Sequence, residues 1–279
     1  MRSLRQPGPA SAERIESVMV RGRRIAYALR AGMTLNEALT APLAAAGLSC
    51  GAIRFEGAVL DPFAFVVPHP APDASHVAYF SPTRRPAGGA RVEVACATFG
   101  WRDGAPFVHC HGAWDSADGG GGHVLPLDSI VARAGVAVAW GSAESRIAVE
   151  PDPETNFPLF RPRAVPAPVT GADGARLAVA RVRPNQDLGP ALAEACRRHG
   201  IARAALRGSL GSLIGARFED GRKVDDIATE VMVLQGEATP EGARIEMLVV
   251  DMRGAVHRGW LAPTGNPVCI TFEAMLEEV

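Results

Sequence analysis

Apolar and polar residues alternate along most of this chain in short runs separated by Gly, Pro, Asn and Asp. Alternation with a period of two residues is the pattern of half-buried β-strands, and the separating residues are those that favour turns. The pattern therefore predicts a sheet-rich protein. The strands are expected at 17–20, 24–29, 52–55, 64–67, 77–80, 92–98, 107–111, 124–125, 136–139, 146–149 and 176–182.

Two segments show the helical period instead. Thr34 and Glu37 match a capping box, in which each side chain bonds the other's backbone N–H, and an apolar stripe follows them. A second stripe begins after Asp187, a good N-cap residue, and stops at Gly200. We expect helices at 35–46 and 188–199.

The order of these elements repeats along the chain, as does the spacing of several apolar residues and glycines. Pairing Leu35 with Leu188 also pairs Gly47 with Gly200 and brings 107–111 onto 245–249. A repeat of this length indicates a tandem duplication of one α+β unit. We expect a flexible arm at 1–16, a first domain at 17–150, a proline-rich linker at 151–168 and a second domain at 169–279.

Composition narrows the classes of function. The chain has 279 residues, of which 29 are basic and 30 acidic, so the net charge is −1. Strong binding to nucleic acid without a partner is not expected, because affinity for phosphates requires a basic surplus. The segment Arg21-Gly22-Arg23-Arg24 resembles the core of an AT-hook, but no proline follows and the setting predicts a hairpin turn.

The five cysteines are scattered and odd in number, and no apolar run is long enough for a membrane helix. We therefore expect a cytoplasmic protein without a membrane anchor.

The sequence 107–126 carries the strongest candidate chemistry. His109 and His111 stand two apart on a predicted strand and point to one face, whereas Cys110 points to the other. Four glycines, 119–122, allow the chain to turn and bring His123 back beside them. Three imidazoles suit zinc or another divalent transition metal, and three protein ligands leave one position open for water or substrate.

The duplication offers an internal comparison. His109, His111 and His123 align with three apolar residues of the second unit. These residues are Met247, Val249 and Trp260. Histidines with a packing role would have no reason to be absent together, so the comparison favours a metal site confined to the first domain.

Each unit resembles the plants-and-prokaryotes conserved (PPC) domain. The resemblance depends on the 35–46 helix with Gly57-Ala58-Val59, on Arg91-Val92-Glu93, and on the histidines of 109–123. The second unit matches through 209–213, 229–231 and 245–261. The last of these stretches lacks the histidine triad and contains only His257. The resemblance implies a mostly antiparallel, barrel-like sheet packed on a helix in each of two tandem copies, and assembly as a homo-oligomer.

Plant members of this family carry an AT-hook that contacts DNA, and bacterial members are often labelled DNA-binding for that reason. This fold group is also similar to acetolactate decarboxylase and to a zinc-dependent ester hydrolase, both of which use a histidine triad of this form.

Two hypotheses of function follow. The first is a zinc-dependent lyase or hydrolase acting on a small molecule, with a carboxylate or arginine beside the metal. Glu93 is the first candidate for that catalytic partner, because it begins a strand expected in the same sheet; Asp115, Asp118, Glu56 and Arg54 are the others. The alternative is a non-catalytic oligomeric regulatory protein, associated with DNA through a partner, in which the metal is structural.

Overall fold

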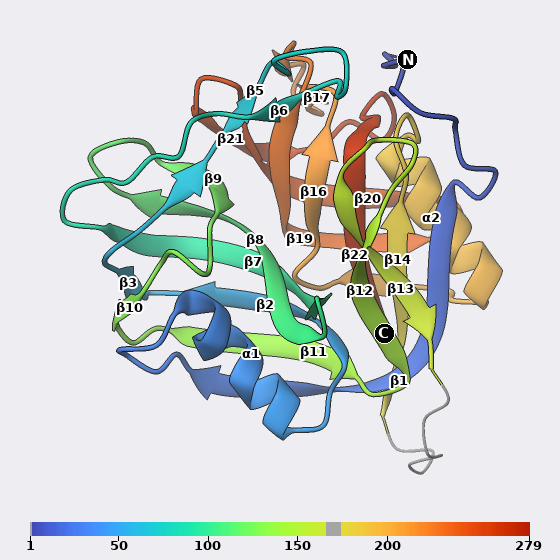
Figure 1. Ribbon diagram of the computed structural model, residues 1–279. Helices are drawn as coiled ribbons and strands as arrows, with labels where there is room; N and C mark the ends of the chain where they lie inside the picture. Colours follow the sequence, from blue (N-terminus) through green and yellow to red (C-terminus); the bar gives the residue numbers. More distant parts are fainter. Residues whose placement is uncertain (1, 166–173) are drawn as a thin grey trace.

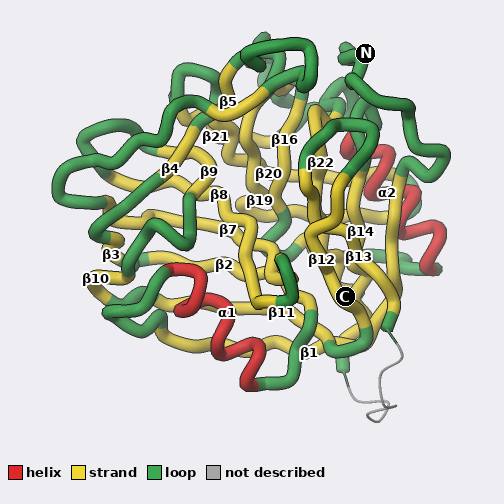
Figure 2. Tube along the Cα trace, viewed as in Figure 1, coloured by secondary structure: helices red, strands yellow, loops and turns green. Residues whose placement is uncertain are grey.

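The computed structural model describes residues 2–165 and 174–279. In this part of the chain the protein is a mostly antiparallel sheet with two helices (Figures 1 and 2), as the alternating pattern predicts. The sheet does not form a clear barrel. None of the described helices is long and apolar enough to cross a membrane.

The helices are α1 (Leu35–Ala45) and α2 (Leu188–His199). The strands up to residue 165 are β1 (Ile15–Ala28), β2 (Cys50–Glu56), β3 (Val59–Leu60), β4 (Phe65–Val66), β5 (Pro68–His69), β6 (Tyr79–Phe80), β7 (Ala90–Arg102), β8 (Ala105–Asp115), β9 (Gly121–Val124), β10 (Val131–Arg133), β11 (Val136–Ser142), β12 (Ser145–Pro151) and β13 (Pro158–Ala164). Those after residue 173 are β14 (Ala175–Val182), β15 (Ala204–Leu206), β16 (Leu210–Leu213), β17 (Ala216–Arg217), β18 (Lys223–Val224), β19 (Thr229–Thr239), β20 (Gly242–Val250), β21 (Val256–Trp260) and β22 (Val268–Glu278).

Strand β1 belongs to both halves of the chain. Its first part, Ile15–Gly22, pairs with β14, and its second part, Arg23–Ala28, pairs with β11. The expected hairpin around Arg21-Gly22-Arg23 is therefore wrong, because the chain continues as one strand. Gly22 permits this crossing, since a Cβ there would lie 2.3 Å from Leu177 Cδ1 and 2.7 Å from the carbonyl oxygen of Gly141.

The helix ends follow the sequence only in part. At α1 the capping box is present, with Thr34 Oγ1 accepting from the backbone N–H of Glu37 and Glu37 accepting from that of Thr34. Helix α2 ends at Gly200 in the left-handed conformation, as expected. Asp187, however, does not cap α2, because its carboxylate accepts from the backbone N–H groups of Gly265 and Asn266.

Apolar packing joins the two halves. In Figure 1 β2, β7, β8 and β11 run across the left of the view, and β14, β16 and β22 run upward on the right. The core beneath α1 also contains four side chains from the second half. They are Leu210, Met232, Leu248 and Val250. The β7–β8 layer therefore packs face to face against β16 and β19, and this contact forms the floor of the site described below.

The expected flexible arm, 1–16, is held in place over the residues the structure describes. The Gln6 amide donates to the carbonyl of Cys269 from a buried position, and Leu4 N–H donates to Asn185 Oδ1. These contacts attach the amino-terminal segment to the second half of the chain.

The expected linker, 151–168, is structured up to residue 165. It contains β13, which pairs along its whole length with β12, and its residues 166–168 lie outside the described residues. Asp152 and Glu154 are buried in it. Proline content suggested a linker, but proline is also accepted in an edge strand such as this one.

A buried ion cluster fixes this segment to the strands behind it. Asp152 Oδ2 lies 2.6 Å from Arg181 and 2.8 Å from Arg183, and both guanidinium groups also contact Glu16. Although burial opposes its ionisation, hydrogen bonding and charge from the two arginines hold the pKa of Asp152 below its usual range. Because the acids and bases come from β1, β14 and 151–165, the cluster ties three distant segments together.

Replacing Asp152 by Asn should destabilise the protein strongly. The change leaves two buried guanidinium groups short of one carboxylate, and breaking a buried ion pair typically costs about 3–5 kcal/mol. Denaturant unfolding followed by circular dichroism measures the effect. Asp220→Asn is the matched control, since Asp220 forms an exposed pair with Arg222, and exposed pairs contribute about 0–1 kcal/mol. Equal effects of the two substitutions would contradict this account of the cluster.

Candidate metal centre

Strands β8 and β9 bring three histidines together. His109 and His111 project from one face of β8, and His111 lies directly opposite His123 in the β8–β9 ladder. The glycine run returns the chain beside β8, as its sequence predicts. Gly122 has φ of +152°, and a Cβ there would lie 2.5 Å from the carbonyl oxygen of Val66, so the tight approach to β4 requires glycine.

The nitrogen atoms of these side chains converge on one point. His109 Nε2 lies 3.0 Å from His111 Nε2, which lies 3.2 Å from His123 Nδ1. Nitrogen ligands of a tetrahedral zinc ion, each about 2.0–2.1 Å from the metal, are separated by about 3.3 Å. The three histidines therefore form a group that could hold a metal ion.

The outward-facing nitrogens set the tautomers. His111 Nδ1 lies 3.0 Å from the backbone carbonyl of Val231, which can only accept a hydrogen bond, so Nδ1 carries the proton. His109 Nδ1 contacts both carboxylate oxygens of Glu273, at 3.0 and 3.1 Å, and donates to them in the same way. In the neutral rings both Nε2 atoms then direct a lone pair toward the centre, which is the arrangement that outer partners impose on metal-binding histidines.

Glu230 adds a carboxylate at the same centre. Its Oε2 lies 2.9 Å from His111 Nε2, and its side chain comes from β19 in the second half of the chain. This spacing is that of neighbouring ligands on one metal ion. Nitrogen and oxygen donors in this number suit zinc and related divalent ions.

Burial and charge act differently on two of the rings. For His109 burial opposes the charged form, but the charge and hydrogen bond of Glu273, with the charge of Glu230, outweigh it and raise the pKa. For His123 burial and the neighbouring histidines lower the pKa well below its usual value. His123 therefore presents a neutral ring, whereas a proton on His109 competes with any metal ion.

Cys110 is not part of this group. It faces the opposite side of β8, and burial, with the charge of Cys96, raises the pKa of its thiol well above the usual value. A thiol held in its protonated form is a poor metal ligand.

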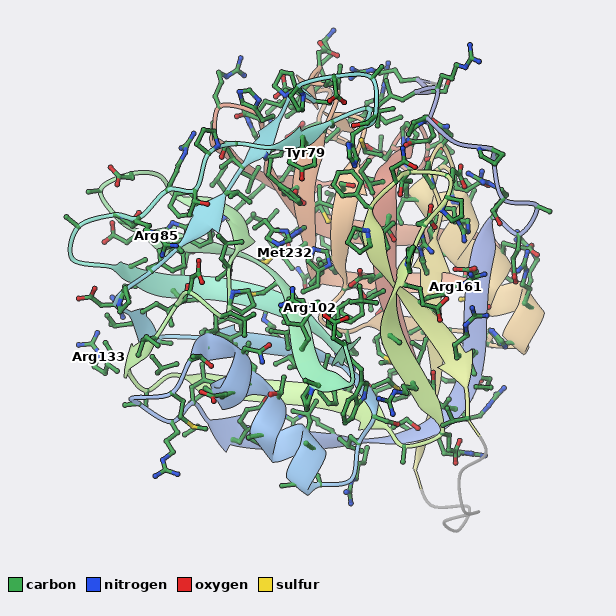
Figure 3. The ribbon with its side chains drawn as sticks, viewed as in Figure 1. Tyr79, Arg85, Arg102, Arg133, Arg161 and Met232 are labelled. Carbon is green, nitrogen blue, oxygen red and sulfur yellow. The ribbon has the colours of Figure 1, made fainter. Side chains whose placement is uncertain are left out.

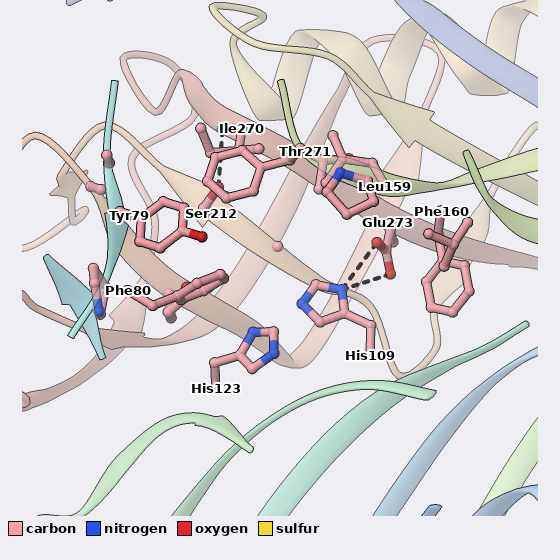
Figure 4. A pocket seen from close by; sticks show the side chains of 18 of the residues that line it. Tyr79, Phe80, His109, His123, Leu159, Phe160, Ser212, Ile270, Thr271 and Glu273 are labelled. Atoms are coloured by element: carbon pink, nitrogen blue, oxygen red, sulfur yellow. Dashed lines mark hydrogen bonds and ion pairs between the residues drawn. The ribbon is translucent and has the colours of Figure 1, made fainter. Parts of the chain in front are cut away.

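The centre borders a cavity of about 320 Å³. His109, His123, Glu230 and Glu273 line it, and the rest of its wall is mainly aromatic and aliphatic (Figure 4). The aromatic wall includes Tyr79, Phe80, Phe107, Phe157 and Phe160. Both halves of the chain and the segment 157–160, which lies in the expected linker, build this cavity, so the cavity does not belong to one half alone.

The structure does not bring the sequence-predicted partners to the histidines. Glu93 sits at a bulge of β7, is exposed, and forms a 2.7 Å pair with Arg258. Glu56 and Asp115 line the same outer hollow as Glu93. Asp118 is exposed, and the Arg54 guanidinium donates to the carbonyl of Leu234.

Sequence reasoning missed Glu230 and Glu273. A signal for the first was present, because the expected alignment of the two halves pairs Glu230 with Glu93. The bulge turns Glu93 outward, whereas Glu230 in the regular part of β19 faces the histidines. Glu273 had no comparable signal, since its role depends on how the two halves pack.

No protein-family profile matches the chain, and no curated protein sequence matches it. Three solved structures are similar to about half of it. A PPC protein from Pyrococcus horikoshii has 17% identity and a TM-score of 0.40 over 53% of this chain and 97% of that one. A metal-containing protein from Archaeoglobus fulgidus has 16% identity and a TM-score of 0.40, over 52% of this chain and 96% of that one. A provisionally assigned DNA-binding protein from Ralstonia eutropha JMP134 has 18% identity and a TM-score of 0.35, over 49% of this chain and 89% of that one.

Replacing Glu273 by Gln should weaken metal binding without removing it. The substitution takes away the carboxylate that orients His109, and loss of such an outer partner costs about 10–100-fold in metal affinity. Competition with a chromogenic chelator measures the zinc affinity. Glu93→Gln is the control, because Glu93 is exposed and lies outside the cavity. A larger loss with Glu93→Gln than with Glu273→Gln would contradict the placement of the site.

Proposed function

We propose that this protein binds one zinc ion through His109, His111 and His123 and is a lyase or hydrolase acting on a small organic molecule. The observation that carries the proposal is the convergence of three imidazole nitrogens beside a mainly apolar cavity, with the outer nitrogens of two of the rings already hydrogen-bonded. A metal with only a structural role would not need a cavity of this size beside it.

Bound zinc would supply Lewis acidity, which polarises a carbonyl group or lowers the pKa of a water molecule. Glu230 is the residue we assign to proton transfer, since its carboxylate lies 2.9 Å from His111 Nε2 and lines the cavity. Glu273 holds the His109 ring in position. The aromatic wall surrounds the reacting groups with apolar side chains, and such a setting of low polarity strengthens each electrostatic interaction there.

We also propose that the two halves, 17–150 and 169–279, arose by duplication. The ladder β2–β7–β8–β9 and the ladder β16–β19–β20–β21 are both antiparallel throughout and occur in the same order. In the second ladder Met247 and Val249, which align with His109 and His111, are buried in an apolar core. One copy would then supply the metal ligands and the other the acidic groups that face them.

Glu230 also supports the second candidate function. A carboxylate at ligand spacing would complete four protein ligands around a structural metal in a regulatory protein. In the enzyme Glu230 transfers a proton, whereas in the regulatory protein it is the fourth ligand of the metal. A homo-oligomeric state and a cytoplasmic location stay predictions.

The double variant His109→Ala, His123→Ala should lose zinc and keep its fold. Both side chains line the cavity and are partly exposed, so truncation enlarges the cavity rather than opening a hole in the core. Elemental analysis gives the metal content, and circular dichroism with thermal unfolding reports the fold. His69→Ala, at an exposed position, is the control. Zinc retained in the double variant would contradict the assigned ligands.

Glu230→Gln should retain zinc, because three histidines remain, and should abolish turnover in a screen of ester and 2-hydroxy-3-oxo acid substrates that the parent protein converts. Loss of zinc from this variant, or absence of turnover in the zinc-loaded parent protein, would favour the structural metal.

A further inference from the structure

We propose that the cavity selects small organic anions, and that Arg102 pairs with the carboxylate of a ligand whose apolar body lies along the aromatic wall toward the histidines. This inference rests on the proposed function for the identity of the reacting end, but the recognition of the carboxylate depends only on groups present in the chain.

Arg102 is a cation in the cavity, and it has no acidic partner in the part of the chain that the structure describes. It lines the cavity and is half-buried, and its Cζ lies 3.8 Å from the centroid of the Phe107 ring. Within residues 2–165 and 174–279, no carboxylate lies within ion-pair distance of it and no acceptor bonds it. Figure 3 shows Arg102 toward the middle of the view, whereas Arg133 lies at its left edge.

The strand register places Arg102 and the metal centre along one wall. In the β7–β8 ladder, Thr98 lies opposite His109, Gly100 opposite Phe107, and Arg102 opposite Ala105. Alternate residues share a face, so Arg102, Phe107 and His109 all project into the cavity. Arg102 stacks on Phe107, which lies two residues before His109 on the same face of β8, so the backbone positions of Phe107 and His109 are about 7 Å apart.

Gly100 allows Phe160 to pack closely on this wall. A Cβ at Gly100 would lie 2.6 Å from Phe160 Cε1 and 2.6 Å from the carbonyl oxygen of Ile147. Glycine therefore lets Phe160 close against the strand between the arginine and the histidines. The result is an apolar segment with a cation at one end and a metal centre at the other.

Charge orients the ligand within the cavity. Glu230 and Glu273 lie at the histidine end, and they repel a free carboxylate there. A guanidinium binds a carboxylate through two parallel hydrogen bonds, which gives direction as well as affinity. A volume of about 320 Å³ lies at the small end of the range for organic ligands. The class that fits is a small carboxylic acid with an aliphatic or aromatic body.

Arg146 provides a matched comparison. Its Cζ lies 4.1 Å from the centroid of Trp101, so it stacks on an aromatic ring as Arg102 does, and no acid pairs with it among the described residues. Arg146 does not line the cavity. A contribution from stacking or general positive charge would be shared by both arginines, whereas ligand recognition is expected only at Arg102.

The test is isothermal titration calorimetry of the full chain with 4-phenylbutyrate and with its neutral amide, 4-phenylbutyramide. We expect the zinc-loaded parent protein to bind the carboxylate about tenfold more tightly than the amide, the size of a hydrogen bond to a charged group. Arg102→Gln should abolish this preference, Arg102→Lys should retain part of it, and Arg146→Gln should leave it intact. Equal binding of the two probes by the parent protein, absence of binding, or a preference that survives in Arg102→Gln would overturn the proposal.

Zinc content and a metal-free sample separate this proposal from the proposed function. The preference should persist after chelation, because Arg102 and not the metal carries it; a preference that disappears with the metal would assign the carboxylate to the zinc and overturn the proposal. A protein that never binds zinc but shows the Arg102-dependent preference would refute the function alone. A zinc-bound protein without that preference would refute the role of Arg102 alone.

Discussion

The site depends on two hydrogen bonds that cross from one half of the chain to the other. His109 donates to Glu273 and His111 to the backbone carbonyl of Val231, and each bond fixes the proton on the outer nitrogen of the ring. In the neutral rings the inner nitrogens hold lone pairs close to one another, an arrangement that is unfavourable unless a cation or a proton lies between them. The packing of the β7–β8 layer on β16 and β19 is what holds the rings in that state.

The two halves contribute unlike groups to one centre, and the rest of the structure keeps them in register. Strand β1 is hydrogen-bonded in both halves, and the buried cluster of Asp152, Arg181 and Glu16 ties 151–165 to the strands behind it. The same segment continues into Phe157 and Phe160 on the cavity wall. A chain that separated into two independent domains would lose the acids facing the histidines, so the site requires the packing of the two halves.

Sequence alone predicted the local features and missed those set by packing. The capping box at Thr34, the strand bearing His109 and His111, and the return of His123 through four glycines depend on neighbouring residues and agree with the structure. Glu93 is predicted beside the histidines because it begins a strand of the same sheet, but it lies at a bulge and pairs with Arg258. Proline content suggested a linker where β13 forms, and polarity suggested a loose arm where Gln6 is buried. In each case contacts between distant segments determine the structure, and a local sequence pattern does not predict such contacts.

The most direct test of the central claim is a crystal structure of the protein grown with zinc, with anomalous data on both sides of the zinc absorption edge. The account predicts one strong peak per chain between His109 Nε2, His111 Nε2 and His123 Nδ1, reachable from the cavity that Arg102 lines. A peak elsewhere, none at the histidines, or a zinc ion sealed from the cavity by four protein ligands would contradict it.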